Sequence, residues 1–547
     1  MALGVPSRPP ELEPLLRSQT SGSAGRLEIP EEATDLIGIE EKPPLLPTLL
    51  FAFQAVRFAR ESFFVCGIST FLQCTFGVRL PMMQGPAAAF LPPLIVLNGM
   101  ERFRCDDTDT AKLNGNSSEA YSNWEEAIQT IQGAQIAGGL FEIFVGASGL
   151  AGLLSRRIGP LTFAPMMLLI TLSNVRAALK DLQSHWMAAV MTGGLLLTIL
   201  YLRRLPVPFP RLRNGRLTWA RLPLLGMFSF LITLTATWCA CAILTAADLL
   251  STDSAARTDS SLAVLAEAPW FRMPYPGQWG RPRFDVALVC SYLASQTASI
   301  VESLGDYMAC AQAAREPPPP KHSASRGILS EGVGSLLGGL MGTGISDTTY
   351  GQNVGVIQAT GVASRRVQQV AALALVIVGV FTKLCAFAAT IPAPIIGATF
   401  AVGMCLVAGI GLSSLGRVDL SLVRNSSILG VAVLFGYLIP YAVQNSRRPL
   451  LNTGWAALDE TMGTLLQIEM IVGAVIGFVL DNTVPGATPE QRGFRSTIQR
   501  PAESDGSGLQ LQRLSQVHDL PFGIQGIINK CPILGRLPFL PPPHHVI

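Results

Sequence analysis

The sequence predicts an all-α protein that crosses a membrane many times, and three observations support this fold class. Only 14% of the 547 residues are charged, against roughly 25% in soluble domains. The mean hydropathy is +0.40. Apolar runs near or above the roughly 18 residues that a membrane span requires recur along most of the chain. The net charge of +3 adds little, because orientation depends on local Lys and Arg rather than on the total.

The candidate spans begin after residue 43. Pro44–Val56 is apolar but too short to span, and Ser62–Val78 is followed by the Pro- and Gly-rich run Leu80–Pro93. Further candidate spans lie at roughly 133–154, 158–175, 185–202, 222–246, 284–302, 327–345, 367–390, 394–413, 427–443 and 465–480.

Both ends of the chain are polar, and the basic loops set the orientation. Residues 1–43 are predicted to form a disordered cytoplasmic tail, and residues 484–547 a second cytoplasmic tail. The loop at 203–221 carries six arginines and no acid, so it should face the cytoplasm. Counting spans from this loop places two loops and one glycosylation sequon outside: 99–130, 247–283 and Asn116-Ser117-Ser118.

One segment, Thr348–Gly361, cannot be an ordinary spanning helix. It holds three glycines together with Gln352 and Asn353, and its apolar part is only Val354–Ala359. Irregular backbone is tolerated at membrane depth only where it is buried in protein or lines a wet cavity. A short, Gly-interrupted segment between full spans is typical of a transporter's binding site. The alternative is a polar loop between two helices.

The span count indicates an internal inverted repeat. If Pro44–Val56 is counted, about seven elements lie in each half, and an odd number per half gives the halves opposite topology. The third element of each half is short and interrupted: Leu80–Pro93 in the first and Tyr350–Gly361 in the second. Such paired segments would meet near the midplane, with half-helix N-termini aimed at a ligand. The alternative is that Gly and Pro are simply common in membrane helices.

Glu302 and Asp306 form a second candidate for a site. On a helix, carboxylates four residues apart lie on one face, a turn from each other. An intramembrane acid costs roughly 2.5–3.5 kcal/mol on insertion scales, so a function is expected for it. Two close carboxylates repel unless a cation or a proton lies between them, and their oxygen ligands suit Na⁺. The alternative for Asp306 is a solvated position at the cytoplasmic end of its helix.

Glu142 and Lys383 also fall in apolar spans, but each is isolated, so packing between helices is the expected role.

These motifs resemble those of the nucleobase–ascorbate transporter family. Gln352–Thr360 is similar to the family signature Q/E/P-N-x-G-x-x-x-x-T, and Glu302–Cys310 resembles the eighth-segment motif of the animal sodium-coupled branch. Gln84–Phe90 is similar to the third-segment motif. The match runs from about Pro44 to Leu520-Pro521-Phe522.

The resemblance implies fourteen segments in an inverted 7+7 repeat, with broken segments 3 and 10. A core domain would contain segments 1–4 and 8–11, a gate domain would contain segments 5–7 and 12–14, and the core would move in an elevator mechanism. The domains would then divide the chain into 44–175 (core segments 1–4 and the start of the gate), 176–283 (gate, with an extracellular loop), 284–390 (core segments 8–11) and 391–483 (gate segments 12–14).

The same resemblance implies sodium-coupled import of nucleobases, of the uracil, thymine, guanine, hypoxanthine and xanthine class, across the plasma membrane. Glu302 would accept hydrogen bonds from ring N–H groups, and Gln352 would pair through its amide. Backbone near Ala88 and Gly351 would complete the contacts, and Asn353 would fix the broken segment. Glutamine at position 352 is the nucleobase-type choice, since the ascorbate branch typically has proline there.

Other ligands and partners follow from the same reasoning. Asp306, together with Glu302, is expected to hold the coupling Na⁺. Ascorbate would require several hydroxyl partners and a cation, although an ascorbate transporter remains an alternative. The expected partners are the nucleobase, Na⁺ and the bilayer, with a homodimer as an option that the sequence leaves open. No cofactor and no nucleic acid is expected.

One departure from the family concerns the first segment. After Phe53-Gln54 the family continues with a histidine and about a full apolar helix, whereas this chain continues with Ala55–Glu61. Most of segment 1 and the start of segment 2 are therefore expected to be missing, which favours a rival interpretation as a non-transporting paralogue or an inactive splice form. The intact Glu302, Gln352 and Asn353 oppose this rival interpretation. An anion exchanger of related fold is disfavoured because Glu302 would repel an anion. An enzyme is not expected, since no nucleophile–base set or cofactor motif is present.

Overall fold

The computed structural model describes most of the chain beyond residue 59. The described residues are 60–86, 88–90, 93–94, 97, 117–213, 216–251, 254–259, 265–266, 269–388, 390–446, 454, 456–494, 517–531 and 534–541. Pro44–Val56 and the sequon at Asn116 lie outside them.

The elements of the first half are α2 (Arg60–Thr75), β1 (Gln84–Pro86), η2 (Ala88–Phe90), α4 (Ser117–Ser148), α5 (Leu150–Ser155), α6 (Pro160–Leu182), α7 (Met187–Leu196), the π-helical turn η5 (Leu197–Tyr201), β2 (Val207–Arg213), β3 (Arg216–Leu222), α8 (Leu224–Met227) and α9 (Ser229–Ala246). Those of the second half are α11 (Val286–Ala313), α12 (Lys321–Met341), β4 (Asp347–Thr349), α13 (Gly351–Thr360), α14 (Arg365–Val380), α15 (Thr382–Ala388), α16 (Ala393–Ser414), η7 (Leu415–Arg417), α17 (Val423–Asn445), α18 (Ala456–Gln467), α19 (Glu469–Thr483), α21 (Ile524–Lys530) and η8 (Leu534–Arg536).

Each span predicted from residue 62 onward falls on one described helix or on two consecutive ones, such as α14 and α15 for 367–390. The predicted ends are less accurate, because hydropathy stops at polar residues whereas the helix continues through them. α11 is the clearest case: the apolar run predicts an end at 302, but the helix continues to Ala313 with Glu302 and Asp306 on it. α4 likewise begins at Ser117, well before the apolar run.

By length and apolarity alone, three described stretches are candidates to cross a membrane: α9, α16 continued by η7, and α17. α14 and α15 meet at 102° and become a fourth candidate if they count as one span. Other long helices fall below this limit because they carry polar side chains that the structure buries in protein, such as Glu331 on α12 and Glu142 on α4. Intramembrane acids of this kind typically face the interior of a helix bundle.

The two broken segments meet, as the repeat predicts. β1 and β4 form an antiparallel pair in which Gln84 lies opposite Thr349 and Pro86 lies opposite Asp347. Each short strand supplies hydrogen-bond partners for the other's backbone, which is how irregular backbone can persist at membrane depth. Both strands lead into short helical pieces, η2 after β1 and α13 after β4.

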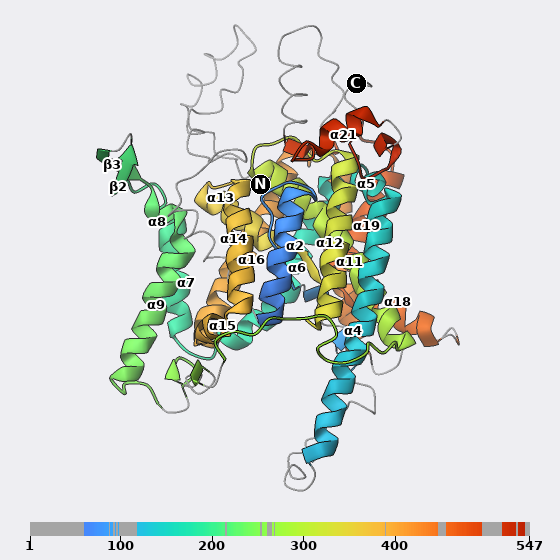
Figure 1. Cartoon of the computed structure of the whole chain (residues 1–547). Helices are drawn as coiled ribbons and strands as arrows, with labels where there is room; N and C mark the ends of the chain where they lie inside the picture. The colour runs from blue at the N-terminus through green and yellow to red at the C-terminus, as the bar shows by residue number, and fades with distance from the viewer. Residues whose placement is uncertain are drawn as a thin grey trace, which may run out of the picture. The chain divides into compact units, whose positions relative to one another are not determined.

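The described helices pack in two groups. In the first group, α2 contacts α12 and α14, and α4 contacts α11 and α12; Figure 1 shows α2 between α14 and α12. In the second group, α6 packs against α16, α17 and α19, and α7 packs against α9 and α16. The division into a core and a gate, with boundaries at 175, 283, 390 and 483, stays a prediction.

Glycine allows α4 and α12 to touch backbone to backbone. A Cβ on Gly146 would lie 2.4 Å from the amide nitrogen of Leu329, and a Cβ on Gly332 would lie 2.6 Å from that of Ile143. Small residues at a helix–helix contact are the usual way for membrane helices to approach closely. The first group is therefore a tightly packed unit around its polar interior.

The residues from Val517 onward do more than continue a polar tail. The carbonyl of His518 accepts a hydrogen bond from Arg326 at 2.8 Å, and that of Val517 accepts one from Arg365 at 2.9 Å. His518 is buried against α12, and burial lowers its pKa to about 3, so its imidazole is neutral at physiological pH. The C-terminal segment thus supplies acceptors for two buried arginines of the first group.

Candidate functional site

The broken segment of the second half places its polar residues at the start of a short helix. β4 ends at Thr349, and α13 runs from Gly351 to Thr360 and is followed by Gly361, which has a left-handed φ of 73°. Because the first backbone N–H groups of a helix have no partner within it, the start of α13 is suited to meet a ligand.

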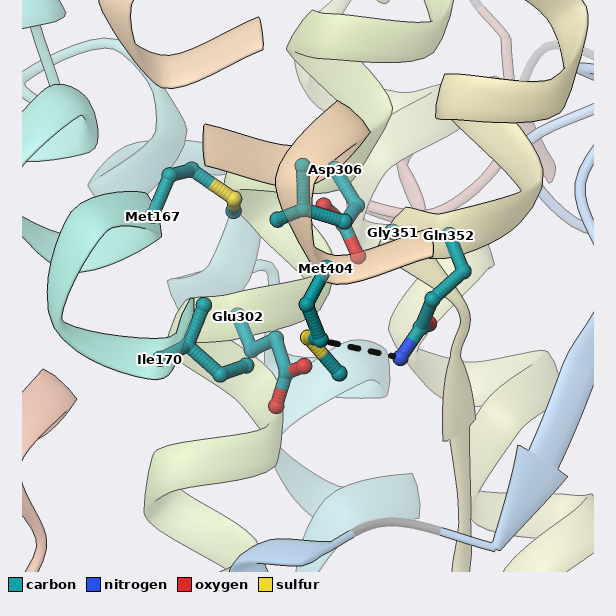
Figure 2. Close-up of a pocket in the computed structure, with 8 residues that line it drawn as sticks. Met167, Ile170, Glu302, Asp306, Gly351, Gln352 and Met404 are labelled. Carbon is teal, nitrogen blue, oxygen red and sulfur yellow. Dashed lines mark hydrogen bonds between the residues drawn. The ribbon is translucent and has the colours of Figure 1, made fainter. Parts of the chain in front are cut away.

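A small cavity lies at this helix start, between the two groups of helices. The polar residues of its lining come from α11 of the first group, which contributes Glu302 and Asp306, and from α13, which contributes Gly351 and Gln352. The second group contributes apolar side chains: Met167, Ile170, Met404 and Val407. The cavity measures about 10 Å³, room for about one water molecule. Figure 2 shows the two carboxylates and the amide of Gln352 directed to the same space.

Both carboxylates on α11 are buried. Glu302 is 8% exposed and Asp306 is 1% exposed, so the alternative of a solvated Asp306 at the helix end is wrong: α11 continues beyond it to Ala313. Asp306 Oδ2 is buried without a hydrogen-bond partner among the described residues. A Cβ on Gly351 would lie 3.0 Å from Asp306 Oδ1, so glycine lets the start of α13 approach this carboxylate.

Gln352 and Asn353 point in different directions. The Gln352 amide faces the cavity, where its Nε2 lies 4.0 Å from the sulfur of Met404 (Figure 2). Asn353 is tied elsewhere: its Nδ2 donates to the carbonyl of Pro81 at 2.9 Å, and its Oδ1 accepts from Gln368 at 2.8 Å. Asn353 therefore holds α13 against the chain before β1 and against α14, and it does not line the cavity.

Ala88 lies in η2, which contacts α11, but it is not among the residues that line the cavity. Of the predicted substrate-contacting residues, the structure thus brings together Glu302, Gln352 and Gly351. The part that each would play toward a substrate stays a prediction.

Sequence reasoning missed the centre of a polar network behind the cavity. Glu331 of α12 is fully buried and accepts hydrogen bonds from four hydroxyl groups. The donors are Ser303 at 2.5 Å, Tyr307 at 3.1 Å, Thr349 at 3.2 Å and Ser299 at 3.4 Å. Glu331 thereby joins α11, α12 and β4. A signal was available, because Glu331 falls inside the predicted span 327–345 and an acid at such a depth indicates a function.

Two further acids belong to the same interior. Asp347 of β4 accepts a hydrogen bond from Ser69 of α2 at 2.8 Å. Glu142 is not isolated, in contrast to the expectation from sequence: it accepts hydrogen bonds from Gln296 at 2.5 Å and from Ser335 at 3.2 Å. Helical spacing alone could not reveal this, since the partners lie on α11 and α12, more than 150 residues away in sequence.

Lys383, the other charged residue predicted to pack between helices, binds an adjacent loop. Its Nζ donates to the carbonyls of Leu265 and Ala266 at 2.8 and 3.1 Å and lies 5.6 Å from the centre of the Trp270 ring. It lies outside the cavity lining and takes no part in the candidate site.

The arrangement is suited to binding a small polar ligand. The lining combines acceptors on one wall, an amide that both donates and accepts, and an apolar opposite wall. Among the described residues, no three His, Cys, Asp or Glu side chains are placed to hold a metal ion. A planar, polar molecule with ring N–H groups is the type of ligand that such a lining would recognise.

Comparison with known proteins gives consistent matches over most of the chain. The sequence profile described as "Permease family" matches residues 43–444. Solute carrier family 23 member 2 of Homo sapiens is 39% identical over 489 residues, which cover 88% of this chain and 74% of that protein. Solute carrier family 23 member 1 of Rattus norvegicus is 38% identical over 491 residues, 87% of this chain and 80% of that protein. Nucleobase-ascorbate transporter 1 of Arabidopsis thaliana is 31% identical over 484 residues, 82% and 88% of the two chains.

Similarity to solved structures is weaker. The structure of SLC26A9 superposes with a TM-score of 0.40 at 11% sequence identity, covering 80% of this chain and 65% of that one.

Proposed function

The chain belongs to the permease family, as its motifs predicted, and from this premise we propose that it is a sodium-coupled transporter that imports nucleobases by an elevator movement of its first helix group. The observation that carries the proposal is the meeting of Glu302 and Gln352 at one cavity. A carboxylate accepts from ring N–H groups, and an amide both donates and accepts, so together they match the lactam edge of a nucleobase.

The opposite wall supports the same substrate class. Met167, Ile170, Met404 and Val407 offer an apolar surface to the face of a flat ring. The cavity of about 10 Å³ is too small for a pyrimidine. A nucleobase can enter only if the two helix groups separate, and relative movement of these groups is what an elevator mechanism requires.

Ascorbate transport is the second candidate, because relatives are named for both substrates. The lining argues against it. Within the described residues, the cavity has two carboxylates and neither a Lys or Arg nor a hydroxyl side chain. An anionic, hydroxyl-rich ligand would therefore find no hydroxyl group and no basic side chain in the lining to pair with.

We further propose that Asp306 and Glu302 hold the coupling ion, that the protein acts in the plasma membrane and that its C-terminus is cytoplasmic. The unpartnered, buried Oδ2 of Asp306 supports the ion assignment, because a buried carboxylate without a partner is costly unless a cation or proton accompanies it.

The first prediction concerns this ion. In NaCl, uracil at about 100 times its Kd should stabilise the purified protein by about 2.7 kcal/mol. Replacing Na⁺ with choline should remove most of this stabilisation, because the cation offsets the repulsion between the two carboxylates. Thermal unfolding with and without uracil measures the effect. In the Asp306→Asn variant, uracil is expected to stabilise the protein to the same extent in both salts. If uracil stabilises the unmodified protein equally in NaCl and in choline, the ion assignment is refuted.

The second prediction concerns Gln352. It is the second residue of α13, where proline fits a helix start, so Gln352→Pro should remove the amide while α13 is retained. The affinity for uracil is expected to fall about tenfold or more, the loss of roughly 1.4 kcal/mol of hydrogen bonding. Equilibrium binding of radiolabelled uracil to the purified protein measures this.

The matched control for this change is Gln358→Ala, a half-buried glutamine further along the same helix. It should leave the affinity for uracil unchanged. If Gln352→Pro binds uracil as tightly as the unmodified protein, the amide does not contact the substrate.

A further inference from the structure

The arginine-rich loop between η5 and α8 folds into a two-stranded ribbon. β2 and β3 pair in antiparallel fashion from Val207 opposite Leu222 to Arg213 opposite Arg216. Beyond each other, the two strands make no extensive contact with the other described elements. Figure 1 shows the ribbon turned away from the bundle, at the outer end of α8. Neither the predicted transport site nor the packing of the helix groups accounts for it.

The register sorts the residues of the ribbon onto two different faces. Directly paired residues share a face, and successive residues alternate between faces. Near the tip, one face therefore carries Arg211, Arg213, Arg216 and Thr218, and the other carries Pro210, Leu212, Leu217 and Trp219. At the base the pattern is not kept, since the first face continues with Phe209 and Ala220 and the second with Arg221. The tip half of the ribbon is thus amphipathic, and the charge of the loop is entirely of one sign: residues 203–222 contain six arginines and neither Asp nor Glu.

The chain connections hold this ribbon close to a membrane surface. It begins six residues after Tyr201, the exposed end of η5, and α9 behind it is a candidate membrane span. Seven residues of strand reach roughly 23 Å at about 3.3 Å per residue. Lys and Arg clusters immediately beside a membrane helix on the cytoplasmic side interact with anionic lipids, and the positive-inside rule places this loop on that side.

We propose that the β2–β3 ribbon is a binding surface for anionic phospholipid headgroups. The face with Arg211, Arg213 and Arg216 binds headgroup phosphates, since guanidinium groups match phosphate oxygens in charge and geometry. The face with Trp219 enters the boundary between headgroups and acyl chains, where aromatic residues are favoured. The ribbon, which joins α7 to α9 of the second helix group, would fix that group to the inner leaflet while the first group moves. Only this last step depends on the proposed elevator mechanism.

The test is limited trypsin digestion of the full chain in lipid nanodiscs. Cleavage after Arg211, Arg213 and Arg216 is followed by mass spectrometry, relative to cleavage after Arg495 in the same molecules, which corrects for attraction of trypsin to the lipid. In phosphatidylcholine mixed with phosphatidylserine, the ribbon should be cut at least about tenfold more slowly than in phosphatidylcholine alone. At about 1 M salt this protection should disappear, because screening shortens the reach of the charges to about 3 Å.

Two variants and a control make the result specific. Exchanging the three arginines for lysine keeps charge and cleavage sites, so protection should persist, whereas Leu212→Ser with Trp219→Ser should weaken it. Arg156→Gln with Arg157→Gln, which removes two basic residues outside the ribbon, should leave protection intact. Equal cleavage in both lipids overturns the proposal. Protection by a soluble polyanion in detergent, without protection by phosphatidylserine, also overturns it and assigns the surface to a soluble partner.

Discussion

Replacing Glu331 with alanine is expected to destabilise the protein by about 3 kcal/mol or more, since each buried hydroxyl left without its acceptor costs about 1–3 kcal/mol. Four hydroxyl groups lose their shared acceptor in this variant, those of Ser299, Ser303, Tyr307 and Thr349. Because Glu331 joins α11 to β4, its loss should also displace Glu302 from the start of α13 and abolish binding of uracil. Thermal unfolding and radioligand binding measure the two effects.

Two other variants separate this role from a general loss of charge. Glu331→Gln keeps the volume and one carbonyl acceptor, so its stability should lie between the alanine variant and the unmodified protein. Glu490→Ala removes an exposed carboxylate outside the bundle and should change neither stability nor binding. A Glu331→Ala protein that unfolds at the unmodified temperature would show that the four hydroxyls find other acceptors and that Glu331 does not organise the site.

The fold could be predicted from the sequence where composition is extreme. Long apolar runs placed the helices, and the Gly- and Pro-rich interruptions at Leu80–Pro93 and Tyr350–Gly361 predicted the meeting that the β1–β4 pair confirms. Helix ends were missed where polar residues continue a helix into the protein interior, as at Asp306 in α11. Hydropathy indicates whether a residue prefers water or an apolar environment. It cannot show that a polar residue within a helix is buried against other polar residues of the fold.

Part of the site could also be predicted from the sequence, because some of its residue types are unusual in apolar spans. Glu302, Asp306 and Gln352 are out of place in hydrocarbon, so their residue type alone indicated a shared location, and the structure brings them to one cavity. Met167 and Met404 form the opposite wall, but apolar residues on apolar helices carry no signal that separates a ligand wall from a lipid-facing surface. Only the packing of α6 against α16 places these two side chains over the carboxylates.

The interruption after Gln54 leads to the second large effect, which concerns transport by the whole chain. The affected residues lie outside those that the structure describes. In the family that the chain resembles, segment 1 would belong to the core, and the sequence predicts that most of it is missing here. Neighbouring segments then lose a packing partner in the bilayer, and lipid fills grooves between small residues poorly.

We therefore expect the chain to reach the cell surface poorly or to transport little, although Glu302, Gln352 and Asp306 are all present at the cavity. Insertion of a full apolar helix after Gln54 should raise sodium-driven uracil uptake by about tenfold or more, the effect of roughly 1.4 kcal/mol or more in folding or assembly. Uptake is measured in cells in Na⁺ and in choline and is normalised to surface protein by biotinylation. An inserted helix of the same length with polar residues at every third position is the control, because it cannot pack in the bilayer and should restore nothing. If the original chain matches the restored chain in both surface level and uptake, segment 1 is dispensable and the remaining helices complete the core without it.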